Sequence, residues 1–303
     1  MKLAMLGLGR MGGNMARRLR RGGIEVVGYN RTYAVAETLQ REEGVEAVDS
    51  IAAAVAVLPS PRRVWLMLPA GEATEAALTE LKGLLAGGDV VIDGGNANYH
   101  DSMRRAAELA ELGVGFIDAG TSGGVWGLAE GYCMMVGGAP EHVALIEPAL
   151  KVLAPAAERG WAHVGPCGAG HFTKMVHNGI EYGMMQAFAE GLSLLRNKPG
   201  FDLDVAQISE LWRHGSVVRS WLLDLTAEAL ARDSALEAIE PFVADSGEGR
   251  WTAIEAIDQG IPAPVMTLAL QMRFASQGKG DYGDKLLATM RNAFGGHAMK
   301  QSD

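Results

Sequence analysis

The sequence predicts an α/β fold in its first half and an all-helical second half. In the first half, short apolar runs alternate with amphipathic helical segments, the pattern of βαβ units in a mostly parallel sheet with helices on both faces. A Gly-x-Gly-x-x-Gly motif directly follows the first apolar run. After Gly165 helical periodicity dominates and no segment is typical of a strand. We therefore expect a Rossmann-type doubly wound parallel sheet followed by an all-α domain.

Apolar runs and their spacing place the elements in order. The expected strands are Leu3–Leu8, Ile24–Tyr29, Val64–Leu68, Asp89–Asp93, Val114–Asp118 and Tyr132–Val136. Helices are expected between them at Met11–Arg21, Glu72–Leu85 and Asp101–Leu112, and from near Pro140. The second half should hold helices at Gly170–Arg196, Asp204–Arg213, Ser220–Ala231, Ala263–Ala275 and Asp281–Phe294.

The longest expected helix, Gly170–Arg196, rests on an apolar stripe at three- and four-residue steps. The stripe consists of Phe172, Met175, Val176, Ile180, Met184, Phe188, Leu192 and Leu195. Glycine and proline cluster just before this helix, which is typical of a domain boundary. We expect a dinucleotide-binding domain at residues 1–165 and a helical substrate and dimerisation domain at residues 166–303.

Composition and charge exclude several classes of protein. The 303 residues are 48% hydrophobic and 21% charged, as in a globular protein with a core. A net charge of −9 argues against nucleic-acid binding through a basic field, so any anionic ligand needs a local cluster of cations. No apolar run reaches the roughly 18 residues that span a bilayer. Two cysteines, no signal peptide and no Cys/His cluster predict a cytoplasmic protein without disulfides or metal.

The glycine motif, Gly7, Gly9 and Gly12, lies where a dinucleotide site requires it. The first glycine permits the tight turn, the second lets backbone approach a pyrophosphate, and the third packs the helix on the strand. The helix N-terminus then offers N–H groups and a positive dipole to the phosphates. A glycine-rich turn without ligand is the alternative, and the position at the start of a βαβ unit disfavours it.

The end of the second strand indicates which dinucleotide binds. An acidic residue there would bind a ribose 2′-hydroxyl, whereas this chain has Asn30, Arg31 and Thr32. Arg31 is suited to pair with a 2′-phosphate and Thr32 to donate a hydrogen bond. We therefore expect NADP in preference to NAD, the alternative being that Arg31 is a solvated loop cation.

Polar residues on the long helix form the second motif. They fall at i, i+3, i+4, i+7 and i+8, on one helical face. These residues are Lys174, His177, Asn178, Glu181 and Tyr182. Such a face is solvated surface in most helices. Here Gly170, Gly179 and Gly183 also thin the helix, as if something must approach it closely.

Lys174 and Glu181 are two turns apart, about 10 Å along the axis. Desolvation in a cleft lowers the pKa of a lysine, so that it can act as a base. Burial raises the pKa of a glutamate, so that it can hold a proton to donate. The pair therefore suits a division of labour between base and acid on one rigid element.

The whole chain resembles the decarboxylating 6-phosphogluconate dehydrogenases, specifically their short bacterial form. The motifs that carry the resemblance are GLGRMGGNMARRL, VIDGGNANYHDS, DAGTSGGVWGLAEG, GHFTKMVHNGIEYGMMQ and RNAFGGH. The fourth is highly specific, and the first is shared by all β-hydroxyacid dehydrogenases. The resemblance implies an enzyme that acts on 6-phosphogluconate with NADP or NAD and no metal. We expect a homodimer or homotetramer on composition alone, because a helical second half in a chain with 15 Met would present a large apolar surface.

The resemblance also implies residue roles. Lys174 would take the proton of the substrate 3-hydroxyl as hydride leaves C3, and then assist loss of CO2 at the 3-oxygen. Glu181 would protonate C1 of the resulting enediol to give ribulose 5-phosphate. The expected cofactor contacts are Gly7, Leu8, Gly9, Arg10, Met11, Gly12, Asn30, Arg31, Thr32, Leu68, Pro69 and Asn96. The expected substrate contacts are Asn96, Ser122, Gly123, Gly124, His177, Asn178, Tyr182, Arg250, Arg273, Arg291 and His297, the last five of these at the phosphate.

The phosphate end departs from the long members of the family. They carry KGTGKW where this chain has Ser246-Gly247-Glu248-Gly249-Arg250-Trp251. Arginine for lysine keeps the charge, while Glu248 adds a negative charge that we expect to disfavour a phosphate. The rival enzyme is a non-decarboxylating β-hydroxyacid dehydrogenase for a small unphosphorylated acid, which needs neither Glu181 nor a phosphate grip. A protein that binds the cofactor without turnover is the third possibility.

Overall fold

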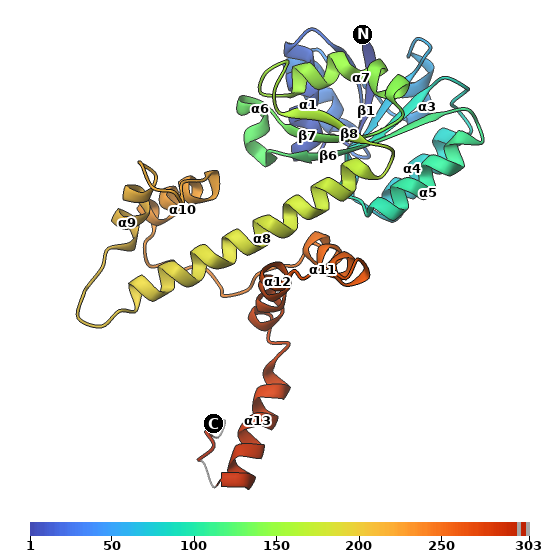
Figure 1. The fold of residues 1–303 in the computed structure, drawn as a ribbon. Coiled ribbons are helices and arrows are strands. Elements are labelled where there is room, and N and C mark those ends of the chain that lie inside the picture. Colours follow the sequence, from blue (N-terminus) through green and yellow to red (C-terminus); the bar gives the residue numbers. More distant parts are fainter. Residues whose placement is uncertain (296–297, 301–303) are drawn as a thin grey trace. The chain divides into compact units, whose positions relative to one another are not determined.

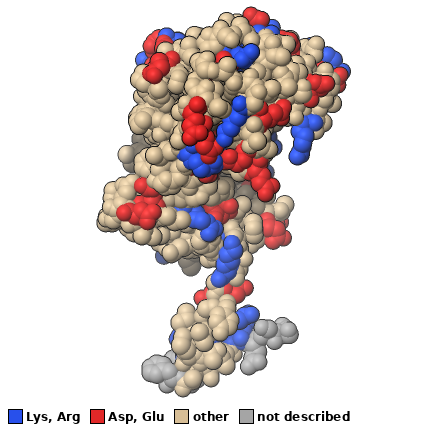
Figure 2. All heavy atoms as spheres, turned by 90° about the vertical axis from the view of Figure 1, so that its right-hand side faces the viewer, with Lys and Arg blue, Asp and Glu red and all other residues tan. Residues whose placement is uncertain are grey.

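A computed structural model describes residues 1–295 and 298–300 (Figure 1). The chain forms two compact units, Met1–Val176 and a second that begins at His177. On the face shown in Figure 2, acidic and basic side chains are interspersed and no broad patch has one sign. No helix in the described part of the chain is both long enough and apolar enough to span a bilayer.

The first unit contains one eight-stranded sheet with the order β3-β2-β1-β4-β5-β6-β7-β8. All neighbours pair in parallel except β6 and β7, which are antiparallel. The strand order reverses beside β1, which creates the switch point where α/β proteins bind ligands. The strands are β1 (Lys2–Leu6), β2 (Glu25–Tyr29), β3 (Glu46–Val48), β4 (Arg63–Leu66), β5 (Val90–Asp93), β6 (Gly115–Ser122), β7 (Cys133–Gly138) and β8 (Trp161–Gly165).

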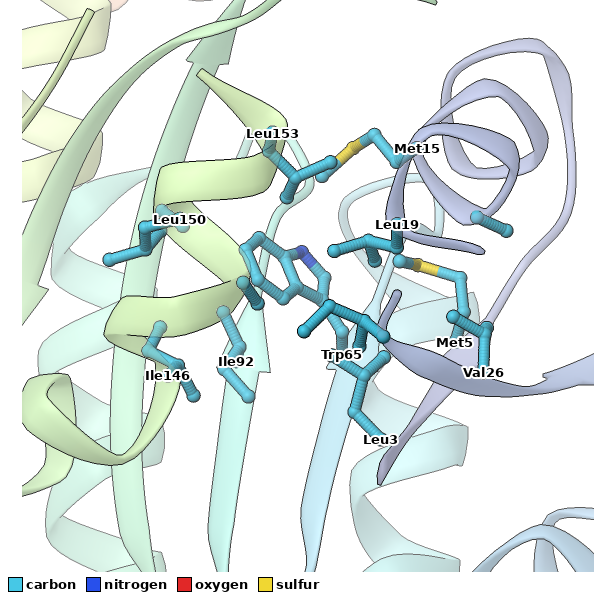
Figure 3. Packing of buried hydrophobic residues seen from close by; sticks show 14 of the residues in the cluster. Leu3, Met5, Met15, Leu19, Val26, Trp65, Ile92, Ile146, Leu150 and Leu153 are labelled. Carbon is cyan, nitrogen blue, oxygen red and sulfur yellow. The ribbon is translucent and has the colours of Figure 1, made fainter. Parts of the chain in front are cut away.

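Helices cover both faces of the sheet because successive strand residues point to opposite sides. One face packs on α1 (Arg10–Arg21), α2 (Tyr33–Glu43) and α7 (Pro140–Leu153). The other packs on α3 (Ile51–Ala56), α4 (Glu72–Lys82) and α5 (Tyr99–Ala110). Figure 3 shows the fully buried Trp65 ring of β4 among Leu19, Leu153 and Ile92. The predicted fold class is thus confirmed for this unit.

The sequence did not predict several elements of the first half. β3 has three residues, too few for periodicity to show, and β8 is an edge strand whose residues are mostly exposed. The helices α2 and α3 were not predicted either. β6 continues four residues beyond the predicted end at Asp118, because its pairing with β7 runs on to Ser122 opposite Cys133.

Beyond Gly165 every helix or strand among the described residues is a helix, as predicted. α8 (Ala169–Arg196) begins in the first unit and ends in the second. Side chains of Asp204 and Ser220 cap the two helices that follow it. The unpredicted α11 starts at a Gly-Glu-Gly sequence that is weak in helix propensity. The second-unit helices are α9 (Val205–Trp212), α10 (Trp221–Arg232), α11 (Glu248–Asp258), α12 (Pro264–Ser276) and α13 (Asp281–Gly295).

Candidate functional site

The glycine loop after β1 has the shape that a dinucleotide requires. Gly7 has φ +94°, and a Cβ there would lie 2.4 Å from the Met67 carbonyl oxygen. A Cβ on Gly12 would lie 2.0 Å from the Gly7 carbonyl oxygen, so this glycine lets α1 pack against the loop. At Gly9, the N-cap of α1, a Cβ would meet nothing within 4 Å, and no side chain caps the helix. The loop is therefore tight inside and open on the side where a pyrophosphate would lie.

A cavity of about 540 Å³ adjoins this loop. Its lining comes from the loop, α1 and α2. The lining residues are Leu8, Gly9, Arg10, Asn14, Arg17, Ala34, Val35, Thr38 and Leu39. The cavity is thus continuous with the open side of the loop and lies next to the end of β2.

Asn30 joins the end of β2 to the glycine loop. Its Oδ1 accepts a hydrogen bond from the Leu8 N–H at 3.0 Å, and its Nδ2 donates to the Thr32 carbonyl oxygen at 3.2 Å. Arg31 and Thr32 are exposed, and Thr32 is the N-cap of α2 without a side-chain hydrogen bond to that helix. The N-terminus of α2 therefore presents backbone N–H groups beside an exposed cation.

The loops after β4, β5 and β6 emerge at the same edge of the sheet, because these strands are parallel. These loops, together with Ser122 at the end of β6, carry the remaining predicted contacts of the first unit. The residues are Leu68, Pro69, Asn96, Ser122, Gly123 and Gly124. The last two have φ of +129° and +50°, conformations that favour glycine.

A buried ion pair that sequence reasoning missed braces the Asn96 loop. Asp93 accepts a hydrogen bond from the Gly95 N–H at 3.1 Å and one from Arg105 at 2.9 Å. The side chains of Asp93 and Arg105 are both 1% exposed. Arg105 also donates to Glu75 of α4, and although partial burial of Glu75 opposes it, hydrogen bonds from Arg104 and Arg105 lower the Glu75 pKa. The network ties the loop before Asn96 to two helices.

A second missed residue, Asp118 of β6, anchors the start of α8. Its fully buried carboxylate accepts hydrogen bonds from the backbone N–H groups of Gly168 at 2.8 Å and His171 at 2.7 Å. The His171 ring, also buried, lies 2.7 Å from the Ser102 hydroxyl. An anion at a helix N-terminus is favourable, so Asp118 fixes where α8 begins.

Lys174 lies one turn further along α8 and is buried, with 6% of its surface exposed. A Cβ added to Gly120 of β6 would lie 2.4 Å from the Lys174 Cβ and 2.8 Å from the Gly170 carbonyl oxygen. A Cβ on Gly170 would lie 2.3 Å from the Asp118 carbonyl oxygen. The two glycines let α8 rest directly on the sheet, which fixes the stem of Lys174.

The other glycines of α8 are approached by protein. A Cβ on Gly179 would lie 2.6 Å from Thr252 of α11, and one on Gly183 would lie 3.2 Å from Val265 of α12. The close approach expected from the sequence is therefore made by neighbouring helices. These two glycines carry no argument for a ligand.

Glu181 is not buried, in contrast to the environment on which the sequence argument relied. Its side chain is 39% exposed, and its Oε2 lies 3.9 Å from His177 Nδ1. His177 Nδ1 also lies 3.0 Å from Asn178 Oδ1. The helical spacing does bring His177, Asn178 and Glu181 together on α8, but the burial that was expected for Glu181 is absent.

At the predicted phosphate end, the structure brings Tyr182, Arg250 and Arg273 together. The Arg273 guanidinium lies 3.4 Å from the centroid of the buried Tyr182 ring and donates to the Ala244 carbonyl oxygen at 2.8 Å. Arg250 donates twice to Asp245, at 2.6 and 3.2 Å. Burial opposes ionisation of Asp245, but the hydrogen bonds from Arg250 and the backbone outweigh it and hold its pKa below the ordinary value.

Glu248, the acidic residue of the segment that departs from KGTGKW, is buried. The Glu248 side chain is 5% exposed, lies in the first turn of α11 and accepts a hydrogen bond from Ser246 at 2.6 Å. Its charge is thus satisfied by Ser246 and the helix N-terminus. Arg291 is exposed on α13, and His297 lies outside the described residues. Among the described residues, no group of three or more His, Cys, Asp or Glu side chains could hold a metal ion.

Comparisons with known proteins identify the family of the chain. The family model for the NAD binding domain of 6-phosphogluconate dehydrogenase matches residues 2–165, and that for the C-terminal domain of the enzyme matches residues 170–302. The NAD(+)-dependent, decarboxylating 6-phosphogluconate dehydrogenase of Haloferax volcanii is 38% identical over 100% of both chains. An NADP(+)-dependent, decarboxylating one from Bacillus subtilis is 37% identical over 91% of this chain and 61% of its own length.

A solved structure of Plasmodium falciparum 6-phosphogluconate dehydrogenase matches 100% of this chain and 67% of its own, with a TM-score of 0.86 and 28% identity. Both family models together account for nearly the whole sequence, and the Haloferax relative matches it from end to end. The chain belongs to the 6-phosphogluconate dehydrogenase family.

Proposed function

We propose that this protein catalyses the oxidative decarboxylation of 6-phosphogluconate to ribulose 5-phosphate and CO2 with reduction of NAD(P)+. The observation that carries the proposal is the fixed position of Lys174. Its side chain is buried, its stem packs against Gly120, and Asp118 anchors the start of its helix, α8. A base fixed by the fold beside the carboxyl edge of a dinucleotide-binding sheet suits removal of a hydroxyl proton during hydride transfer.

The glycine loop fits the cofactor. Gly7 and Gly12 leave no room for a Cβ, whereas Gly9 and the uncapped α1 face open space. When bound, the nicotinamide supplies an acceptor for the hydride from C3 of the substrate. Gly7–Gly12 would hold the pyrophosphate, and the loops that carry Leu68, Pro69 and Asn96 would border the rest of the cofactor.

Three proton transfers are assigned to two residues of this chain, Lys174 and Glu181. Lys174 accepts the proton of the 3-hydroxyl as the C3–H bond breaks, which leaves a 3-keto acid. The carboxylate carbon then leaves as CO2, its bonding electrons pass to the 3-oxygen as an enediol, and Lys174 returns a proton to that oxygen. Glu181 protonates C1 of the enediol to give the ketopentose. Asn96, Ser122–Gly124, His177 and Asn178 are proposed to hold the carboxylate and hydroxyls.

We favour NADP as the preferred cofactor. Arg31 and Thr32 are exposed at an α2 N-terminus that no side chain caps, so a cation, a hydroxyl and backbone N–H groups are available to a 2′-phosphate. Asn30 brings no charge and uses its amide to hold the turn. Because curated relatives are named for either cofactor, this preference is a property to be measured for each chain.

The remaining assignments are proposals of the same kind. Arg250 and Arg273 would hold the 6-phosphate, with Arg291 and His297 completing that end. We place the domain boundary at 165/166, near the start of α8, and propose a homodimer or homotetramer. The cytoplasmic location rests on Cys133 and Cys167, which form no disulfide.

The test is an assay of the purified protein with 6-phosphogluconate and equal concentrations of NADP or NAD. We expect reduced cofactor and CO2 in equal amounts, with faster reduction of NADP. Reduction without CO2, or reduction only with an unphosphorylated 3-hydroxy acid, would favour the non-decarboxylating rival. Faster reduction of NAD would contradict the role given to Arg31 and leave the reaction intact.

A further inference from the structure

The first turns of α5 and α8 are joined by a buried hydrogen bond between two side chains. Ser102 Oγ of α5 lies 2.7 Å from His171 Nδ1 of α8. Ser102 is fully buried, and His171 is 1% exposed. His171 Nε2 is buried as well and has no hydrogen-bond partner among the described residues, so Nδ1 makes the one hydrogen bond of the ring there. The orientation of the ring therefore depends on Ser102.

The two helices also pack closely around this pair. A Cβ on Gly168, just before α8, would lie 2.8 Å from Met103 Cγ and 3.5 Å from the Tyr99 carbonyl oxygen. The rings of Phe172 and Tyr99 meet edge to face, with centroids 5.2 Å apart. The Ser102–His171 hydrogen bond thus lies within a tight contact between the starts of α5 and α8.

Each of these helices is tied to a residue of the proposed site. Lys174 lies on α8 one turn after His171. Asn96 lies in the loop that leads into α5, and the Asn98 side chain caps that helix by accepting a hydrogen bond from the His100 N–H at 3.0 Å. A contact that fixes α5 against α8 therefore fixes the proposed base relative to a proposed substrate contact.

We propose that His171 is a positioning residue for the reaction: through Ser102 it holds the helix of Lys174 against the helix that follows Asn96. This inference rests on the proposed function for its substrate. The ring of His171 is buried, and we assign it no proton transfer. Its role is distinct from that of Asp118, which accepts hydrogen bonds from backbone N–H groups of α8 and ties that helix to β6.

Two substitutions of similar polarity separate the two ring nitrogens, His171→Asn and His171→Gln. An asparagine amide reaches about as far as Nδ1 and can turn its oxygen or its nitrogen towards Ser102, whereas a glutamine amide extends towards the position of Nε2. We expect His171→Asn to keep kcat for 6-phosphogluconate within about threefold of the parent, and His171→Gln to lower it by about 10- to 100-fold. Asparagine is the poorer helix former, so helix propensity opposes this result.

Cofactor binding distinguishes positioning from a general structural defect. The glycine loop does not involve residue 171, so the Kd for NADP, measured by fluorescence titration on the full chain, should stay within about twofold in both variants. Equal kcat values for His171→Asn and His171→Gln would overturn the proposal. A parallel loss of NADP affinity and kcat in His171→Gln would also overturn it, because the defect would then be a general one.

Ser102→Ala tests the same hydrogen bond from the other side, and it carries the test if His171→Gln does not fold. Its kcat should fall as far as that of His171→Gln, and the double variant should lose no more, because the two side chains act as a unit. The matched control is Ser209→Ala, which removes a buried hydroxyl that donates to the Val205 carbonyl oxygen within α9. Parent-like kcat in Ser102→Ala, or additive losses in the double variant, would contradict the proposal.

An experiment without substrate separates this inference from the proposed reaction. Acetic anhydride acylates lysine amines, and mass spectrometry of the digested full chain gives the rate at Lys174, with Lys151 as internal standard. We expect His171→Gln and Ser102→Ala to raise the rate at Lys174 at least about threefold, and His171→Asn to leave it unchanged. An unchanged rate in all three variants would defeat the positioning role. Failure of the parent to oxidise 6-phosphogluconate would defeat the proposed reaction and would not alter this labelling result.

Discussion

Lys174 and Glu181 lie on one helix, but their surroundings differ. Lys174 is 6% exposed, its stem rests on Gly120, and Asp118 anchors its helix one turn before. Glu181 is 39% exposed and has a 3.9 Å pairing with His177. Packing by the fold therefore fixes the position of Lys174, the proposed base. Glu181, the proposed acid, is not enclosed by packing in the same way. Changes around Lys174 should act through geometry as well as chemistry, and changes at Glu181 through chemistry alone.

The largest effect is expected from Lys174→Met. Oxidation of 6-phosphogluconate should fall by about 10²–10⁴-fold, because a methionine side chain does not accept the hydroxyl proton. Cofactor binding, followed by fluorescence titration, should persist, since the glycine loop is untouched. The matched control is Lys151→Met, which removes a partly exposed lysine paired with Glu147. Parent-like oxidation by Lys174→Met would remove it as the base.

Glu181→Gln should have the next largest effect, and on a different step. Formation of ribulose 5-phosphate should fall by about 100-fold while the variant keeps its fold, because an amide does not donate the proton that C1 needs. Cofactor reduction and pentulose are measured separately. Glu190→Gln, on the same helix and exposed, serves as control. Full pentulose formation by Glu181→Gln would contradict the role of Glu181 as the acid that protonates C1.

Gly120→Ala tests the geometric half of the comparison. The new methyl group would lie 2.4 Å from the Lys174 Cβ, so α8 must shift, and overpacking of this kind costs about 1–3 kcal/mol of unfolding free energy. Turnover should fall more than binding of the cofactor. The control is Gly191→Ala on α8, where an added Cβ would meet nothing within 4 Å. This variant should be neutral or stabilising. Equal behaviour of the two variants would show that Gly120 does not seat the base.

The sequence predicted what depends on local pattern. The glycine loop, the alternation of the sheet and the long helix with Lys174 and Glu181 all follow from residues close together in the chain. β8 and α11 escaped because tertiary contacts stabilise them: one is an exposed edge strand, and the other begins at two glycines of weak propensity.

The supports of the candidate site depend on distant partners. Asp118 bonds to Gly168, 50 positions away, and Tyr182 bonds to Ser246, 64 positions away. A sequence pattern does not reveal such pairings. An aspartate at the end of an apolar strand was a signal for Asp118, because a buried carboxylate must have partners. No local sequence pattern indicated which groups would form hydrogen bonds with the Glu248 carboxylate.

The smallest expected effect is at Tyr132, which tests the consequence of burial alone because this residue has no proposed role in the reaction. It is fully buried, and its hydroxyl has no hydrogen-bond partner among the described residues. Burial, opposed by the charge of Arg18, raises its pKa to about 12. The unfolded chain therefore releases this proton near pH 10 while the native state retains it, so stability present below pH 10 is lost as the pH rises towards 12.

Tyr132→Phe removes both the titration and the unpartnered hydroxyl. At pH 7 the variant should be as stable as the parent or more so, because a buried hydroxyl without a partner costs free energy. The difference in unfolding free energy between Tyr132→Phe and the parent should be about 1 kcal/mol larger, in favour of the variant, near pH 11 than at pH 7. Denaturant unfolding at both pH values measures the difference. If this difference in unfolding free energy is the same at both pH values, the Tyr132 hydroxyl is in contact with solvent. Lys174, packed against Gly120, would then be the better enclosed of the two side chains.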